Sequence, residues 1–310
     1  MSKLAVFKLY VARLPAPVRG VLLMALAAAM FVCMHAIIRD LGKNAELHPF
    51  EIAFFRSFLG LFVLAPLLIR QRFRPLHTNN MKLLFLRGAV NAAAMLMFFY
   101  GLSITPLAEA TALGFTAPLF ATLLAMLFLG EVVRIRRWIA ILIGFAGTLV
   151  IIQPGVAEVG LGPILILSAT VVWSFALIII KFLTRTESSV TITVYASIFL
   201  SPFSLAAAVF FWRWPTPEEA GWLCLIALLG TIAQTAMNQS LKLADASVVL
   251  PMDFSKMIWA AILGFFIFGE VPGIYTWIGG AMIFFSTTYI AIRESRLKKQ
   301  AVPSSDKSSG

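Results

Sequence analysis

The sequence predicts an all-α polytopic membrane protein whose ten transmembrane helices form two inverted five-helix repeats. Three observations lead to this fold class. First, 60% of the 310 residues are hydrophobic and only 13% are charged, and with a mean hydropathy of +0.92 this lies outside the range of soluble globular proteins. Second, the chain divides into ten long apolar segments. Third, the fourth and ninth segments carry the same ordered set of residues at both of their ends.

The predicted membrane helices follow from apolar runs of about 20 residues, the length that crosses about 30 Å of hydrocarbon. The runs lie between polar breaks at residues 20–38, 50–69, 83–102, 107–129, 138–152, 161–182, 190–212, 221–241, 244–268 and 274–292. Basic residues precede the first run, as they would in a secretory signal, but its length and the spans after it indicate a retained helix. Two tails remain, at 1–19 and 293–310, and the end of the second has a disordered composition.

The net charge of +11 is predicted to set the orientation in the membrane, not to bind nucleic acid. If the helices alternate in direction, 19 of the 25 Lys and Arg residues fall on the side that holds both termini, and 3 fall on the other side. The remaining three, Arg56, Arg87 and Lys256, lie within the helices. The positive-inside rule then places both termini in the cytoplasm, with the helices in the inner membrane.

The duplication lies in the fourth and ninth helices. The fourth begins Leu-Ala-Glu-Ala-Thr at 107–111 and ends Gly-Glu-Val at 130–132; the ninth begins Leu-Ala-Asp-Ala-Ser at 243–247 and ends Gly-Glu-Val at 269–271. Each repeat, 20–153 and 160–292, holds five spans, and an odd number makes the second copy enter the membrane from the opposite face. Inverted repeats are typical of secondary transporters, which bind substrate near the bilayer midplane. Duplication retained only for packing is the alternative.

With these features the sequence resembles the EamA type of the drug/metabolite transporter superfamily. Each repeat opens its fourth helix with small residues, carries a proline within it and closes it with Gly-Glu, most clearly in segments 107–131 and 244–270. The segment 48–56, HPFEIAFFR, is similar to the second helix of bacterial members related to S-adenosylmethionine carriers. The resemblance covers nearly the whole chain. It implies a secondary carrier with a cavity lined by spans one, three, four, six, eight and nine, without fixing the substrate or the direction.

The deepest charged pair is the first candidate for substrate binding. Asp253 and Lys256 are three residues apart and can neutralise each other on one helical face. They follow Pro251, whose missing N–H leaves a carbonyl free for a ligand. Lys256 would then meet a substrate carboxylate, whereas the alternative is an ion pair that serves packing. Pro118 in the fourth helix is predicted to break that helix and to assist the motion of the two halves.

Three other titratable side chains within the spans are candidates for gating or coupling. Arg56 in the second span could act as a gate or could extend to the nearby interface. Arg87 could likewise act as a gate or extend to the interface, although Asn91, one turn deeper, offers a donor and an acceptor at a site edge. His35 could couple transport to protons or could be a hydrogen-bonded interface residue.

The remaining candidates are neutral. Gln234 and Asn238 form a polar stripe in the eighth helix that would contact substrate or a neighbouring helix. Trp173, in mid-span, could form an aromatic wall with Tyr100 and Phe115. The acids Glu109 and Asp245 are predicted to cap helix starts, and Glu131 and Glu270 to anchor loops.

We therefore predict a secondary active transporter for an amino acid or an S-adenosylmethionine-like metabolite, working by alternating access with a proton or an exchanged counter-substrate. No cofactor or metal is expected, because the two cysteines lie far apart in apolar runs and the three histidines lie in unlike contexts. The alternative class is a non-transporting membrane protein or a lipid-modifying enzyme.

Overall fold

The structure is a computed structural model that describes residues 14–44, 47–129, 135–154, 158, 160–183, 186–244 and 246–301, nearly all of them helical. Ten helical segments within these residues are long and apolar enough to cross a membrane, which confirms the ten predicted spans. The membrane segments are α2 (Ala16–Asn44), α3 (Pro49–Arg70), α4 (Met81–Ser103), α5 (Leu107–Gly114), α6 (Ala117–Leu129), α7 (Ile135–Ile152), α8 (Leu161–Leu183), α9 (Ser189–Ala208), α10 (Pro217–Leu243), α11 (Ala246–Asp253), α12 (Ser255–Phe268) and α13 (Ile274–Ala301).

Two of these helices start at reciprocal caps that fix where the chain enters the bundle. At α3, the His48 side chain accepts from the Phe50 N–H while Glu51 accepts from the His48 N–H. At α10, Thr216 and Glu219 form the corresponding capping box. Such caps satisfy N–H groups that have no partner within the helix.

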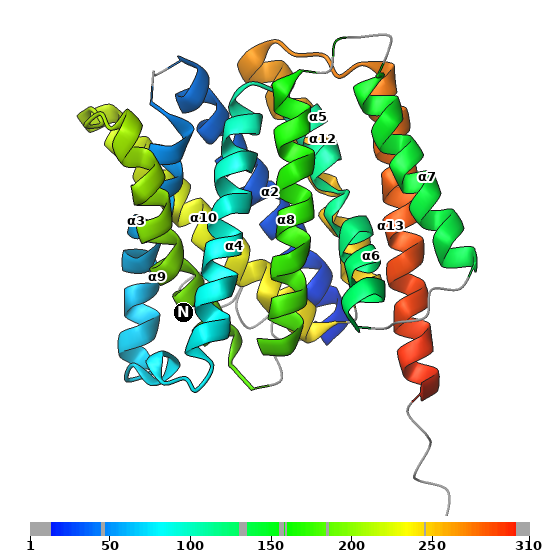
Figure 1. Ribbon diagram of the computed structural model, residues 1–310, viewed down its shortest axis with the longest axis horizontal. Coiled ribbons are helices and arrows are strands. Elements are labelled where there is room, and N and C mark those ends of the chain that lie inside the picture. The colour runs from blue at the N-terminus through cyan, green and yellow to red at the C-terminus, as the bar shows by residue number, and fades with distance from the viewer. Residues whose placement is uncertain are drawn as a thin grey trace, which may run out of the picture.

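The helices pack in one bundle (Figure 1), with α3 beside α9 at one edge and α7 beside α13 at the other. Between these edges, α2 packs against α10 and α4 packs against α8. The first helix of each half therefore packs against the third helix of the other half: α2 against α10, and α8 against α4. An exchange of the two halves by a twofold rotation would produce this pairing.

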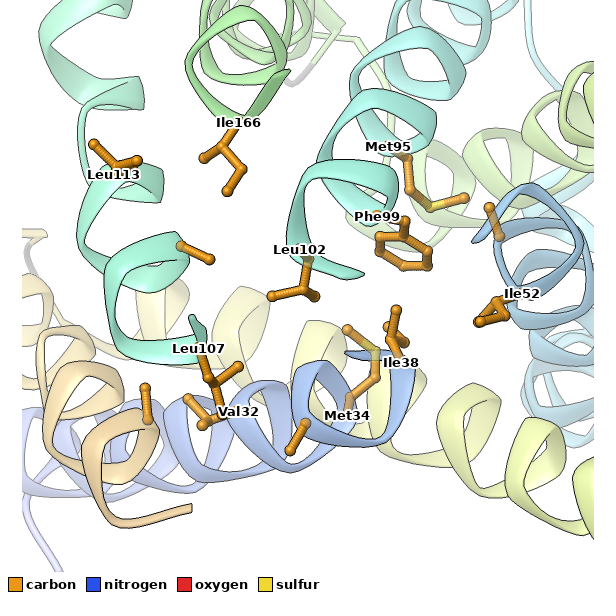
Figure 2. Close-up of a cluster of buried hydrophobic side chains, with 14 of the residues drawn as sticks. Val32, Met34, Ile38, Ile52, Met95, Phe99, Leu102, Leu107, Leu113 and Ile166 are labelled. Carbon is orange, nitrogen blue, oxygen red and sulfur yellow. The ribbon is translucent and has the colours of Figure 1, made fainter. Parts of the chain in front are cut away.

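Helices of both halves meet in one apolar core (Figure 2). The core also includes residues of α7, α9, α10, α12 and α13; the labelled side chains, from α2, α3, α4, α5 and α8, are Val32, Met34, Ile38, Ile52, Met95, Phe99, Leu102, Leu107, Leu113 and Ile166. Because lipid is as apolar as such side chains, small residues that permit close packing contribute much of the association between membrane helices. At the contact of α7 with α13, a Cβ atom on Gly147 would lie only 2.7 Å from the Gly279 carbonyl oxygen.

The fourth and ninth spans are each broken near the middle. The first break separates Gly114 of α5 from Ala117 of α6, and the second lies at Phe254, between α11 and α12. Pro118, the second residue of α6, has no N–H to donate to the Gly114 carbonyl, so the α-helical ladder cannot run through this point. Pro251 lies in the last turn of α11. The first break therefore falls beside Pro118, at which we predicted a discontinuity, and the second follows Pro251 by three residues.

The bundle has two ends, which we name by the chain termini. The terminal end is where α2 begins and α13 ends. The distal end is where α2 ends, α5 begins and α12 ends.

Candidate functional site

Side chains at the two helix breaks gather into one cluster, here called the central site. It joins α2 and α4 of the first half to the break of the second half. Its members are Phe31, His35, Phe98, Phe115, Asp253, Phe254 and Lys256.

The charged part of the central site is an ion pair across the second break. Lys256 Nζ lies 2.6 Å from Asp253 Oδ1, and the two side chains are 16% and 18% exposed. The same ammonium group lies 4.8 Å from the centroid of the Phe31 ring, within cation–π distance. A charge at the centre of a membrane helix costs about 2.5–3.5 kcal/mol on insertion scales, and pairing offsets part of that cost.

Aromatic rings close the central site on its other sides. Phe115 and Phe254, one at each helix break, stack with centroids 4.0 Å apart. The His35 ring lies 5.3 Å from Phe98 and 6.3 Å from Phe31. Of these five residues, Phe115 and His35 are candidates from the sequence, whereas Phe31, Phe98 and Phe254 are not, because their rings are no different in type from the many that pack against lipid.

The first break is held against α8 by hydroxyl groups. The Thr116 and Thr170 hydroxyls are 3.0 Å apart, and Ser174 Oγ donates to the Ala117 carbonyl at 2.9 Å. Trp173, beside Ser174, is half-buried in the middle of α8. The predicted mid-span position of Trp173 thus falls next to residues that contact the break.

Arg56 extends from α3 toward the middle of the bundle. Its Nη1 lies 3.2 Å from Met95 Sδ, and its guanidinium carbon lies 5.9 Å from the centroid of the Phe99 ring. It also borders Gly230, near the midpoint of α10, where a Cβ atom would lie 3.2 Å from the guanidinium Nε. These contacts are with other helices of the bundle, not with the interface.

Two of the polar candidates, Arg87 and Asn238, contact the first turns of α9, and Gln234 binds Asn238. Arg87 Nη1 donates to the Ile192 carbonyl at 2.5 Å, and Asn238 Nδ2 lies 3.4 Å from the Thr193 hydroxyl. Gln234 Nε2 donates to Asn238 Oδ1 at 3.3 Å. The bond from Asn238 to Thr193 joins α10 to α9 and corresponds to the packing alternative stated for the polar stripe. Asn91, one turn along α4 from Arg87, is half-buried.

Tyr100 lies in a separate aromatic cluster at the distal end. Its ring is 5.8 Å from His48 and 6.1 Å from Phe50, and His48 stacks on Phe211 at 3.9 Å. Burial lowers the pKa of His48 below its ordinary value of 6.5. The described ring contacts of Tyr100 are therefore with this cluster, whereas those of Phe115 are in the central site.

A second ion pair, here called the distal latch, joins the two halves. Arg39 near the end of α2 donates from Nη1 to Glu270 Oε2 at 2.6 Å and from Nη2 to Glu270 Oε1. Glu270 Oε2 also accepts from the Leu107 N–H at 3.3 Å, so it satisfies a free donor at the start of α5. Glu270 thus does more than anchor a loop. The sequence analysis missed Arg39 as its partner, although both residues close spans that end on the same side.

Metal-binding and thiol chemistry have little support in the described part of the chain. There, no three His, Cys, Asp or Glu side chains gather as metal ligands. Cys33 is half-buried in α2 and Cys224 is exposed on α10, and both are free.

Comparison with known proteins places this geometry in a family. The EamA-like transporter family matches residues 18–153 and again residues 160–292. The chain is 29% identical over 262 residues to the S-adenosylmethionine uptake transporter of Rickettsia bellii, covering 84% of this chain and 89% of the relative. It is 30% identical to the riboflavin transporter of Rhizobium johnstonii, covering 91% and 93% of the two chains. It is 29% identical to the pseudopaline exporter CntI of Pseudomonas aeruginosa, covering 90% and 97%.

A solved crystal structure supports the same fold. It superposes with a TM-score of 0.63 at 16% identity and covers 91% of this chain and 98% of its own. The two family matches together span nearly all of the ten helices. This multi-pass membrane protein belongs to the EamA-like transporter family of the drug/metabolite transporter superfamily.

Proposed function

We propose that the chain is a secondary active transporter that moves a small polar metabolite, an amino acid or an S-adenosylmethionine-like compound, across the inner membrane. The observation that carries the proposal is the Asp253–Lys256 ion pair, which lies within the membrane beside a helix break. Ionisable residues at such depth are expensive and mark substrate or ion pathways. Broken helices at the midplane are the usual substrate sites of secondary transporters.

The proposed mechanism is alternating access, in which the repeats 20–153 and 160–292 rock about the central site. Support comes from the paired contacts of α2 with α10 and α4 with α8, which an inverted twofold relation between the repeats would produce. In this mechanism the distal latch holds the halves together at the distal end while substrate enters from the terminal end. Its rupture would accompany opening of the distal end.

The proposed orientation places the terminal end, and with it both chain termini, in the cytoplasm. The excess of Lys and Arg on that side supports it. A fluorescent protein fused to the C-terminus should fluoresce, and alkaline phosphatase fused there should be inactive. Active phosphatase at the C-terminus would reverse the orientation.

The site supports a substrate that carries charges of both signs. Asp253 can receive a substrate ammonium and Lys256 a carboxylate, while Phe115 and Phe254 present ring faces beside them. Trp173 is proposed to extend this aromatic lining, and Tyr100 to line the path at the distal end. Arg87, Asn91, Gln234 and Asn238 would line the path to the terminal end.

The experiment is counterflow in proteoliposomes that contain the full chain and no other protein. S-adenosylmethionine, a panel of amino acids and riboflavin would be tested as labelled substrates, and at least one should show saturable exchange. Lys256→Met should abolish that exchange at unchanged protein abundance. The matched control is Lys82→Met at the exposed start of α4. Absence of exchange for every compound, with correctly inserted protein, would refute the proposal.

Coupling and enzymatic activity are tested in the same vesicles. We propose that His35, in the central site, couples uptake to protons, so an imposed pH gradient should accelerate uptake by the native protein and not by His35→Gln. We also propose that the chain is not an enzyme, so the vesicle lipids should keep their masses throughout. A lipid product that depends on the protein would support the lipid-modifying alternative.

A further inference from the structure

Arg56 is a charged side chain inside the membrane that has no counter-ion in the described part of the chain. Its printed contacts are a methionine sulfur and an aromatic ring, from Met95 and Phe99. Its Nε is buried and has no hydrogen-bond partner among the described residues. The described carboxylates of the two ion pairs within the membrane are already bound elsewhere, Glu270 by Arg39 and Asp253 by Lys256.

The surroundings of Arg56 allow the guanidinium to stay there. Gly230 leaves the space: a Cβ atom at this position would lie 3.2 Å from Nε and 3.4 Å from Nη2 of Arg56, and 2.8 Å from Met34 Sδ. Met34, Met95 and Phe99 belong to the buried core, which excludes water from the same region (Figure 2). A guanidinium is always protonated, so it cannot escape the cost of burial by losing its charge.

An unpaired buried cation is costly, and a chain retains one when it has a use for the charge. Here the cation lies toward the central site. The Cβ position of Gly230 lies 3.2 Å from Arg56 Nε and 2.8 Å from Sδ of Met34, the residue of α2 that precedes His35 of the central site. The Asp253–Lys256 pair is neutral overall, so Arg56 leaves the region with an excess of one positive charge.

We propose that Arg56 binds the anionic group of the transported molecule and that this group is a carboxylate. The planar fork of a guanidinium matches a carboxylate with two parallel hydrogen bonds. A zwitterionic amino-acid moiety would place its carboxylate on Arg56, which has no counter-ion among the described residues, and its ammonium on Asp253, where it would take the place of Lys256. This inference rests on the proposed transport function and names the chemistry that the site selects.

The first test measures stability without any ligand, so it does not depend on transport. Arg56→Gln keeps polar bulk and removes the uncompensated charge. Its melting temperature in detergent should rise by about 4 °C relative to the native full-length protein. The matched control is Arg39→Gln, which removes an arginine that has a partner and should lower the melting temperature. A fall or no change for Arg56→Gln would assign the arginine to packing and overturn the inference.

The second test measures selectivity by counterflow with two pairs of compounds that differ in the carboxylate. The first pair is S-adenosylmethionine and its decarboxylated form, and the second is methionine and methioninol. The native protein should prefer the carboxylate-bearing member by at least about tenfold. Arg56→Gln should lose that preference.

The outcomes separate this inference from the proposed function. Exchange that keeps its carboxylate preference in Arg56→Gln would overturn the inference and leave the transporter intact. Exchange by the native protein of riboflavin and of none of the carboxylate-bearing compounds would do the same, since riboflavin has no carboxylate. If no compound exchanges in the native protein, the proposed function fails and the inference fails with it.

Discussion

The distal latch allows the contact between the two halves to be measured as a free energy. We consider Arg39→Met, Glu270→Met and the double variant. The Arg39 side chain is 4% exposed and that of Glu270 is 24% exposed, so the two ions differ in how well water can replace a lost partner. In Arg39→Met, Glu270 would also keep the hydrogen bond that it accepts from the Leu107 N–H. Losing the carboxylate should therefore cost more than losing the guanidinium.

Removing one partner of a buried ion pair costs about 3–5 kcal/mol, because the other charge is left uncompensated. We expect about 4 kcal/mol for Glu270→Met, which leaves the buried guanidinium alone. We expect about 2 kcal/mol for Arg39→Met, which leaves a partly hydrated carboxylate at a helix start. The double variant removes both charges and should cost about 2 kcal/mol, so the coupling energy would be about 4 kcal/mol.

Scanning fluorimetry of the purified variants measures these effects. At about 2 °C per kcal/mol for a chain of this size, the melting temperature should fall by about 8 °C for Glu270→Met and about 4 °C for Arg39→Met. Additive losses in the double variant would show that the two side chains do not depend on each other. That result would refute the latch.

Accessibility measures whether the latch also closes the distal end. Ala260 is fully buried and lines a hollow of about 180 Å³ that Glu270 also lines. A cysteine at position 260, in a background without Cys33 and Cys224, should react slowly with a membrane-impermeant maleimide. Adding Glu270→Gln should raise the labelling rate at least about tenfold, the factor that corresponds to 1.4 kcal/mol of bias toward the open state. An unchanged rate would separate the ion pair from gating.

Three further predictions concern the stability of the bundle. Gly147→Ala should destabilise the protein by about 1–3 kcal/mol because α7 and α13 must separate, whereas Gly221→Ala, where a Cβ meets nothing within 4 Å, should not; melting temperatures compare the two. Phe254→Ala should cost about 3 kcal/mol by removing the ring stacked on Phe115, and a loss below about 0.5 kcal/mol would contradict that contact. His48 has a lowered pKa in the folded state, so the unfolded chain binds the proton first and stability should fall as the pH drops below about 6.5. His48→Asn, which keeps a capping side chain, should flatten this dependence in melting curves between about pH 7.5 and 5.5, and an equal slope would exclude His48 as its source.

The candidate site could be predicted from the sequence only where its contacts are local. Asp253 and Lys256 are three residues apart on one helix path, and helical geometry brings such residues to the same face. Their pairing was therefore predictable. Pro118 likewise marks the first break, because its missing N–H interrupts the helical ladder at that point. For Arg56, the sequence left two directions open, and packing against Met95 and Gly230 selected one.

Contacts between distant segments could not be derived in this way. Arg39 and Glu270 are 231 residues apart, and Arg87 meets a carbonyl of α9 that no local spacing indicates. Tyr100 was grouped with Phe115 by residue type, yet its described ring contacts are with His48 and Phe50 at the distal end. Ring type carries little information in a chain with 13% aromatic residues.

By itself, the sequence determined the ten membrane helices, the return of both termini to one end and the duplicated fourth and ninth helices. These follow from run length, from an even number of crossings and from residue order, none of which depends on how helices pack. The tertiary structure alone decided which helix faces meet. It paired Arg39 with Glu270 at the distal end, placed Lys256 over the Phe31 ring, and left Arg56 without a counter-ion among the described residues. The reason is that lipid gives an apolar face no preference among its neighbours, so only packing and buried polar contacts select the partner.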